Sequence, residues 1–423
     1  MEQKSTAQKW LIAVIAIIVI SPIVYWATGI GQHADKLSAA VVAANGTLHN
    51  SPKAEALHAL VLPIRIEKLI VYPALLFLLQ FSGWAVRWRS RIEQWVFRIT
   101  RRKNRWTRTL AAALFIAWVT ATITIIYLPF SIYGFVLRRQ FGLSNQPFGA
   151  WARDFGVGWL LGLLTNWVLY GGLFALINLS PRRWPVWAGA AFMAFSFGYI
   201  LLEPVVITPL FYEITPLTDA ALRRRIDTMA ARAGITIDDV RVINASSKTS
   251  AVNAYFTGFG KASKIVLWDT LLKNHPPDEV DMVIAHEMGH WVHRHVLWYV
   301  LGGSSALWLG LFALRRWLNR VWRRLGWRSP GDVAAYPYLL GVIALVSALT
   351  LPVANGISRA AENQADDFAL EIGGKPQAAA QMFERFAVEN VSMVTVPAWE
   401  KIIFYTHPPL GERIRKAEKK MGK

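Results

Sequence analysis

The sequence predicts a mainly α-helical integral-membrane protein of seven spans, with one small α/β unit inserted between the fifth and the sixth. The first observation is composition: 54% of the 423 residues are apolar and the mean hydropathy is positive, which is unusual for a soluble enzyme. The second is clustering, because the apolar residues form runs long enough, or nearly so, to cross a bilayer as helices of about 20 residues. The seven runs are 11–28, 62–80, 110–130, 156–178, 187–209, 296–314 and 335–354.

Two of these runs carry special features. Lys4 and Lys9 precede the first run, as in a cleaved signal peptide, but the length of the run favours a retained membrane anchor. The fifth run contains Glu203-Pro204, which predicts a kink with the carboxylate facing protein or water rather than lipid.

The longest polar interruption, residues 210–294, predicts the inserted α/β unit. Residues 218–234 have helical periodicity, with Asp219 as a start signal and a glycine at the end. Pro276-Pro277 open a second helix with an acidic first turn, and we expect this helix to continue towards the sixth span. Between the two helices, three short β-prone runs occupy 240–243, 254–257 and 264–268.

The chain therefore divides into four predicted regions. We expect a membrane region of five spans over 1–209, the inserted unit over 210–294, spans six and seven over 295–354, and a C-terminal helix with a soluble tail over 355–423. The C-terminal helix is predicted as a separate acidic segment, near 354–370, that leaves the membrane region.

The net charge is strongly basic, at +19, and its distribution points to a membrane. The Arg and Lys residues cluster between spans two and three, over 87–108, and between spans six and seven, over 315–328. Such juxtamembrane clusters set topology and attract anionic lipid headgroups. No nucleic-acid-binding motif accompanies them, so we expect membrane lipids and no nucleic acid as partners. The absence of cysteine excludes disulfides, thiolate metal ligands and cysteine nucleophiles.

The run His-Glu-Met-Gly-His at 286–290 is the clearest chemical signal in the chain. Four residues return almost to the same face of a helix, so His286 and His290 can direct their imidazoles at one zinc ion. Glu287 then lies beside them as a base for zinc-bound water rather than as a ligand. The pentapeptide alone is moderately specific, and a catalytic zinc site needs a third protein ligand.

The third ligand is predicted on a separate helix. A metzincin pattern would place a histidine at 296, which is valine, and we interpret the nearby His293 and His295 as solvated or interfacial. Glu362 is the better candidate, although an isolated glutamate on a helix is more commonly an exposed carboxylate with no ligand role. Asp366, one helical turn later, can accept the free ring N–H of a ligating histidine.

Taken together, several motifs resemble the type I CAAX prenyl endopeptidase family of integral-membrane zinc metalloproteases. The resemblance covers almost the whole chain, including the seven spans and the position of the inserted unit. It is carried by 286–291 (His-Glu-Met-Gly-His-Trp), by Ser-Arg-x-x-Glu-x-x-Ala-Asp at 358–366, by Asn-Ala-Tyr-Phe-Thr-Gly at 253–258, by Ile-Val-Leu-Trp-Asp-Thr-Leu at 265–271, and by His407-Pro408-Pro409 with Arg413.

The resemblance implies a fold and a metal site. The expected fold is a mainly α seven-helix membrane barrel that encloses a chamber and carries a gluzincin-like α/β metalloprotease domain. One Zn²⁺ per chain would be bound by His286, His290 and Glu362, with Glu287 as general base and then as proton donor to the leaving amine.

Further site residues follow from the same resemblance. The segment with Asn253, Ala254 and Tyr255 is expected to be the edge strand that aligns an extended substrate, although it can also be an ordinary strand end. His407 is expected to stabilise the oxyanion, or else to pack in a rigid turn. Arg413 can pair with Asp366 or Glu362, or face solvent.

The predicted function is hydrolysis of peptide bonds by zinc-activated water in a multi-pass membrane protein. The family implies a polypeptide substrate with a prenylated C-terminus, and the alternative is quality-control cleavage of membrane proteins with no need for a prenyl group. A rival class is a transporter or scaffold with structural zinc. Such a site uses four protein ligands, whereas three are predicted here.

The sidedness of the membrane has two conflicting predictions. The basic loops after spans two, four and six place the N-terminus in the cytoplasm and the inserted domain outside. The resemblance to eukaryotic members places the catalytic domain towards the cytosol. The expected location is the inner or cell membrane if the source is bacterial.

Overall fold

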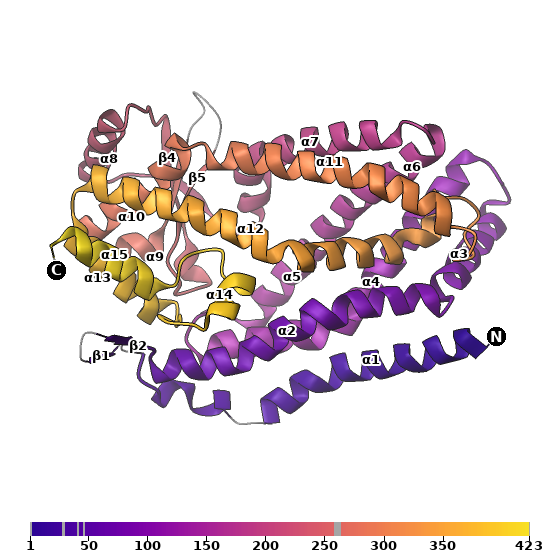
Figure 1. Cartoon of the computed structure of the whole chain (residues 1–423), viewed down its shortest axis with the longest axis horizontal. Coiled ribbons are helices and arrows are strands. Elements are labelled where there is room, and N and C mark those ends of the chain that lie inside the picture. Colours follow the sequence, from indigo (N-terminus) through magenta and orange to yellow (C-terminus); the bar gives the residue numbers. More distant parts are fainter. Residues whose placement is uncertain (1, 28–29, 40–41, 45–46, 258–263, 423) are drawn as a thin grey trace.

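Long helices dominate the computed structural model, which describes residues 2–27, 30–39, 42–44, 47–257 and 264–422. Figure 1 shows them running roughly lengthwise, with a small sheet and shorter helices gathered at one end. The membrane region contains α1 (Glu2–Ala27), α2 (Pro52–Phe81), α3 (Trp84–Thr100), α4 (Arg105–Gln140), α5 (Phe148–Asn166), α6 (Gly172–Leu179), α7 (Trp184–Leu202), α11 (His295–Val321) and α12 (Tyr336–Gly373), with a short hairpin of β1 (Val42–Ala44) and β2 (Thr47–His49) after α1.

The seven predicted spans correspond to these helices. Among the described residues, six helical segments are long and apolar enough to cross a membrane singly, and the bent pair α2 and α3, with an angle of 59° between them, supplies a seventh. Two of the spans are broken by π-helical turns, at Trp167–Gly171 between α5 and α6 and at Glu203–Ile207 after α7. The second break contains Glu203-Pro204, where the sequence predicts a kink.

The separate helix predicted near 354–370 is wrong, because α12 runs unbroken for 38 residues. Its first part belongs to the seventh span, and its last turns enter the α/β unit. The change from apolar to polar composition marks the edge of the membrane region, and nothing there forces a helix to end. Gly374, in the left-handed region with φ of 66°, ends the helix instead.

The inserted unit is a four-stranded sheet with helices packed against it. The strand order is β3-β4-β6-β5, in which β4 and β6 are parallel and the two outer pairs antiparallel. The predicted strands are present, while the short β3 was not predicted. The elements are β3 (Ile214–Pro216), α8 (Ala220–Arg232), β4 (Asp239–Ile243), β5 (Ala254–Thr257), β6 (Lys264–Trp268), α9 (Asp269–Asn274) and α10 (Pro277–Val292).

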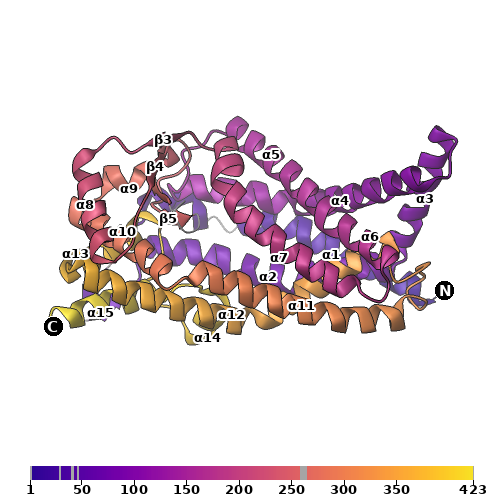
Figure 2. The same ribbon diagram turned by 90° about the horizontal axis from the view of Figure 1, so that it is seen from above.

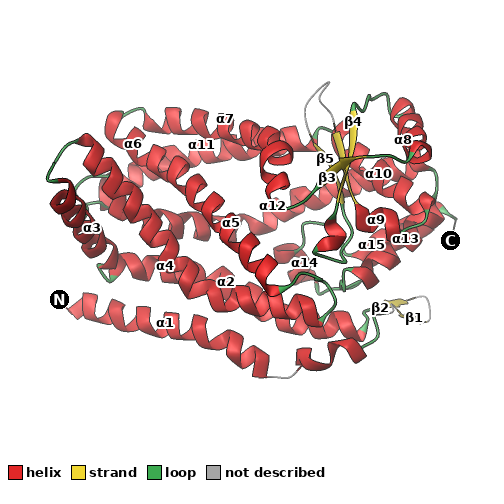
Figure 3. Ribbon diagram, turned by 180° about the vertical axis from the view of Figure 1, so that it is seen from behind, coloured by secondary structure: helices red, strands yellow, loops and turns green. Residues whose placement is uncertain are grey.

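Three C-terminal helices complete this part of the molecule: α13 (Pro376–Glu389), α14 (Ala398–Phe404) and α15 (Leu410–Lys420). One apolar core joins α13 and α15 to the inserted unit, with Ile226 of α8, Leu267 of β6, Ile284 of α10, Phe383 of α13 and Ile414 of α15 all buried in it. α14 packs against α12. The C-terminal helices therefore fold together with the inserted unit at the same end of the molecule, as Figures 1 and 3 show.

The chain continues from α10 towards the sixth span, as expected, but not as a single helix. α10 ends at Val292, and Arg294, with φ of 55°, adopts a left-handed conformation before α11 begins at His295. Because a single left-handed residue changes the direction of the chain, α11 leaves at a new angle. It then runs beside α7 (Figures 1 and 2).

The two basic segments lie at the end opposite the sheet. In Figure 1, α3 is near the N-terminus at one end, and the sheet with α8 and α10 is at the other. The turn between α11 and α12 also lies at the end that holds α3 (Figures 1 and 2). Both predicted basic clusters therefore face the same side of a membrane that the spans would cross.

α10 and α12 pack closely at Gly289. A Cβ atom placed there would lie 3.0 Å from the Ala365 Cα, 3.2 Å from the Ala365 carbonyl oxygen and 3.2 Å from the Phe368 Cβ. Two of these three atoms belong to backbone, which cannot rotate away. The glycine therefore sets how near α10 can come to α12.

We expect Gly289→Ala to destabilise the protein by about 1–3 kcal/mol, because the added methyl group must push the two helices apart. Gly310→Ala in α11 is the matched control, since no atom lies within 4 Å of its added Cβ. Thermal unfolding of both variants in the same detergent measures the difference. Equal stability of the two variants would show that the α10–α12 contact tolerates the methyl group.

Candidate active site

Three side chains from two helices converge on one point. His286 and His290 extend from successive turns of α10, and Glu362 extends from α12. The His286 Nε2 lies 3.1 Å from the His290 Nε2 and 3.3 Å from the Glu362 Oε2, and the His290 Nε2 lies 3.4 Å from the Glu362 Oε1. The buried Oε2 of Glu362 has no hydrogen-bond partner among the described residues.

These distances fit a tetrahedral metal ion. Ligand bonds of 2.0–2.2 Å at tetrahedral angles separate neighbouring ligand atoms by roughly 3.3 Å, close to the three observed separations. Two imidazoles and one carboxylate are a donor set that zinc accepts, and they leave a fourth position open. His286, His290 and Glu362 can therefore hold a metal ion.

His286 is oriented by a carboxylate. Its Nδ1 lies 2.9 Å from Asp366 Oδ1, and the Arg413 Nε donates to Asp366 Oδ2 at 2.9 Å. The Arg413 Nη2 also donates to Asp366 Oδ1, so the pair is bidentate. All three residues are buried. Asp366 thus holds the His286 ring with its Nε2 towards Glu362, and Arg413 holds Asp366.

His290 is oriented by another histidine. The Nδ1 atoms of His290 and His295 lie 2.9 Å apart, and the His295 Nε2 lies 2.9 Å from Gln364 Oε1. His295 is buried, so its interpretation as a solvated residue is wrong, whereas His293 is exposed. The left-handed turn at Arg294 starts α11 beside α10 and turns His295 back towards the site. Its position in the first turn of an apolar span was the signal in the sequence, because polar groups there usually have a specific partner.

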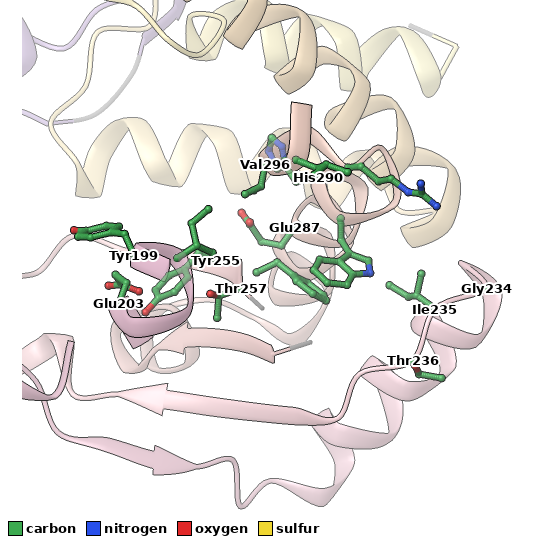
Figure 4. A pocket seen from close by; sticks show the side chains of 15 residues that line it. Tyr199, Glu203, Gly234, Ile235, Thr236, Tyr255, Thr257, Glu287, His290 and Val296 are labelled. Atoms are coloured by element: carbon green, nitrogen blue, oxygen red, sulfur yellow. The ribbon is translucent and has the colours of Figure 1, made fainter. Parts of the chain in front are cut away.

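Glu287 lies between two cavities. One, of about 770 Å³, is lined by Glu287 and His290, and the other, of about 340 Å³, by Glu287 and His286. Burial raises the pKa of the Glu287 carboxyl, against the opposing charges of His286 and His290. A carboxylate with a raised pKa is suited to accept and return a proton. Figure 4 shows Glu287 directed into the larger cavity.

Strand β5 forms one wall of both cavities. Asn253 and Ala254 line the smaller cavity, and Tyr255, Phe256 and Thr257 line the larger. β5 is the last strand of the sheet, and no strand in the described part of the chain pairs with its outer edge. An extended peptide added along that edge would pass Glu287. Gly258, the last residue of the predicted motif, lies outside the described residues.

His407 completes the smaller cavity. Its Nε2 lies 3.2 Å from Glu362 Oε1, in the connection between α14 and α15. α12 holds this connection, because Asn355 Nδ2 donates to the Ile403 carbonyl at 2.6 Å and Arg359 Nη1 donates to the carbonyls of Lys401 and Tyr405 at 2.7 Å. The sequence did not predict that Asn355 and Arg359 of α12 hold this connection.

Proteins with similar sequences include a metalloprotease and several CAAX prenyl proteases. Residues 216–421 match the model of peptidase family M48, and residues 66–213 match the model described as the CAAX prenyl protease N-terminal region with five membrane helices. A metalloprotease of Bacillus subtilis, YhfN, is 32% identical over 318 residues, covering 74% of each chain. The chain belongs to peptidase family M48. The CAAX prenyl protease 1 homolog of Oryza sativa is 31% identical over 75% of this chain and 74% of its own, and CAAX prenyl protease 1 of Saccharomyces cerevisiae is 30% identical over 72% of each chain.

The M48 assignment agrees with the fold. The structure of Ste24p from S. mikatae superposes with a TM-score of 0.72 over 98% of both chains, at 22% sequence identity. The predicted fold class, a seven-helix membrane barrel enclosing a chamber and carrying an inserted metalloprotease domain, is confirmed. The protein is a multi-pass membrane metalloendopeptidase.

We expect His295→Ala to weaken metal binding by roughly 10–100-fold, because the variant removes the group that orients His290. His293→Ala, two residues away and exposed, is the matched control and should keep normal affinity. Competition with a chelator measures metal retention independently of activity. Equal metal retention in the two variants would contradict an orienting role for His295.

Proposed function

We propose that this protein is a zinc endopeptidase in which His286, His290 and Glu362 bind one Zn²⁺ per chain. The proposal rests chiefly on one observation: the three side chains have tetrahedral spacing, and the carboxylate of Glu287 lies beside them between two cavities. When bound there, zinc would acidify a water molecule and polarise the scissile carbonyl.

The remaining steps use the side chains of the site. Glu287 accepts the proton of the attacking water and later delivers it to the leaving amine. His407 donates a hydrogen bond to the carbonyl oxygen as negative charge develops there. Asp366 and Arg413 keep His286 in one tautomer and one orientation, and no acyl-enzyme forms.

The substrate is held by backbone contacts. Ala254 and Tyr255 lie on β5 and Asn253 directly precedes it, so an extended polypeptide of any sequence can pair with the outer edge that the described strands leave open. The peptide bond opposite Glu287 is the one cleaved. Chain segments on either side of that bond enter the two cavities.

We propose polypeptides, including those with a prenylated C-terminus, as the substrate class. The larger cavity can receive an apolar group, because Ile200, Phe256, Trp291 and Leu297 line it. The cleavage rates of matched peptides with and without a prenyl group test this proposal. We expect faster cleavage of the prenylated peptide, whereas a role in quality control predicts equal rates. The transporter or scaffold alternative does not agree with membership of a peptidase family or with a site of three protein ligands.

We further propose that the catalytic end faces away from the cytoplasm and that the basic end contacts anionic lipid. Both basic segments lie at the end opposite the sheet, where positive residues face the cytoplasm by the usual rule. A reporter fused after Lys423 measures the orientation. A cytoplasmic signal would support instead the sidedness implied by the eukaryotic relatives.

We expect Glu287→Gln to retain one metal ion per chain and to lower kcat by at least about 10³-fold, because the amide cannot accept a proton. His286→Ala should lose the metal as well. Metal analysis and peptide cleavage on the same purified samples separate the two effects. Normal proteolysis by metal-loaded Glu287→Gln protein would refute the assignment of the base.

A further inference from the structure

Glu203 is an acidic residue in a membrane-spanning segment that the catalytic steps do not use. It begins the π-helical turn Glu203–Ile207, in which the Thr208 N–H donates to the Glu203 carbonyl oxygen. Pro204, the next residue, has no N–H to offer to the helix. π-helical turns of this kind occur frequently at functional sites.

The Glu203 side chain faces the protein, while its neighbours face outwards. Leu202, Val205 and Val206 are exposed, whereas Glu203 is partly buried and lines the 770 Å³ cavity. Figure 4 shows it next to Tyr199 and Tyr255, at one end of the cavity that Glu287 enters.

No cation neutralises Glu203 within the described ranges. Its Oε1 accepts a hydrogen bond of 2.5 Å from Thr208 Oγ1, and it takes part in none of the ion pairs of the described residues. Arg294 lines the same cavity but forms no ion pair with it there. A carboxylate at this depth is costly unless it has a partner, and it commonly marks a binding site.

The structural role of Glu203 does not account for its charge. A neutral amide oxygen could also accept the hydrogen bond from Thr208, so the turn itself has no need of a carboxylate. The negative charge is therefore available to a group that enters the cavity. A peptide paired with β5 enters there, since Tyr255 lies both on that strand and beside Glu203.

We propose that Glu203 is a specificity-determining residue that binds a cationic group of the polypeptide substrate, either a Lys or Arg side chain or a free α-amino group. The cavity then combines apolar walls with one acidic end, and it selects a positive charge at a fixed distance from the cleaved bond. This inference rests on the proposed endopeptidase function.

The test measures kcat/KM for peptides that share one cleavage site. Members of the set carry Lys, Arg, norleucine or Glu at each position near that site, with the N-terminus either free or acetylated. We expect wild-type protein to prefer a cationic residue over norleucine at one position by roughly tenfold or more, as for a charge-assisted hydrogen bond. A preference that depends on the free N-terminus alone identifies the α-amino group as the ligand.

Glu203→Gln should remove this preference while leaving the cleavage of norleucine peptides unchanged, because the amide keeps the Thr208 contact and loses the charge. Glu203→Lys should reverse the preference towards Glu. Glu213→Gln is the matched control, since Glu213 is exposed ten residues later and does not line the cavity.

The outcomes separate this inference from the proposed function. Absence of any metal-dependent cleavage by wild-type protein would refute the endopeptidase function itself. Cleavage without a preference for cations, or an equal loss for all peptides in Glu203→Gln, would refute the specificity role alone. An equal change of preference in Glu213→Gln would show that general surface charge causes the preference for cationic peptides, which would also refute the specificity role of Glu203.

Discussion

The close contact between α10 and α12 is the constraint on which the site depends. Two histidines on one helix supply only two ligands, and the third is 72 residues beyond His290 along the chain. Gly289 lies between the histidines and touches the α12 backbone at Ala365, so Glu362 reaches the imidazoles from one turn before that contact. A side chain larger than hydrogen at position 289 would displace α12 and, with it, the Glu362 carboxylate. The displacement would be comparable to the small variation that metal–ligand distances allow.

Charge also indicates a divalent ion. Glu287, Glu362 and Asp366 bring three carboxylates into a small volume, and Arg413 supplies one fixed positive charge. When both histidines are neutral, as metal ligation requires, these groups carry a net charge of −2. Without a metal ion, burial lowers the pKa of His286 but its hydrogen bonds to Asp366 and Glu362 raise it to about 9, so a proton on His286 offsets part of that charge. Buried charges of one sign are unfavourable unless a counterion accompanies them, and a divalent metal ion would balance this cluster. The site is therefore matched to its ion in charge as well as in geometry.

Local features were predictable from the sequence, and long-range contacts were not. The spans, the strands at 240–243, 254–257 and 264–268 and the helix with 286–290 follow from hydrophobic period and turn residues, which act over a few positions. The role of His295 depends on the left-handed turn at Arg294, and the position of His407 depends on Asn355 and Arg359, about 50 residues away. Only the family resemblance joined Glu362 to the histidines, because no local pattern encodes which helices pack together. The continuity of α12 was missed for a related reason. The change from apolar to polar residues indicates where the membrane region ends, but it does not indicate where a helix ends.

We propose that His286, His290 and Glu362 bind one zinc ion and leave its fourth position open. Zinc K-edge absorption spectroscopy of the purified protein, with metal content measured on the same sample, tests it most directly. We expect one zinc per chain, with two imidazole nitrogens and one carboxylate oxygen at about 2.0–2.2 Å and one further light ligand from solvent. A zinc ion bound by four protein groups, or a correctly folded protein that binds no zinc, would contradict it.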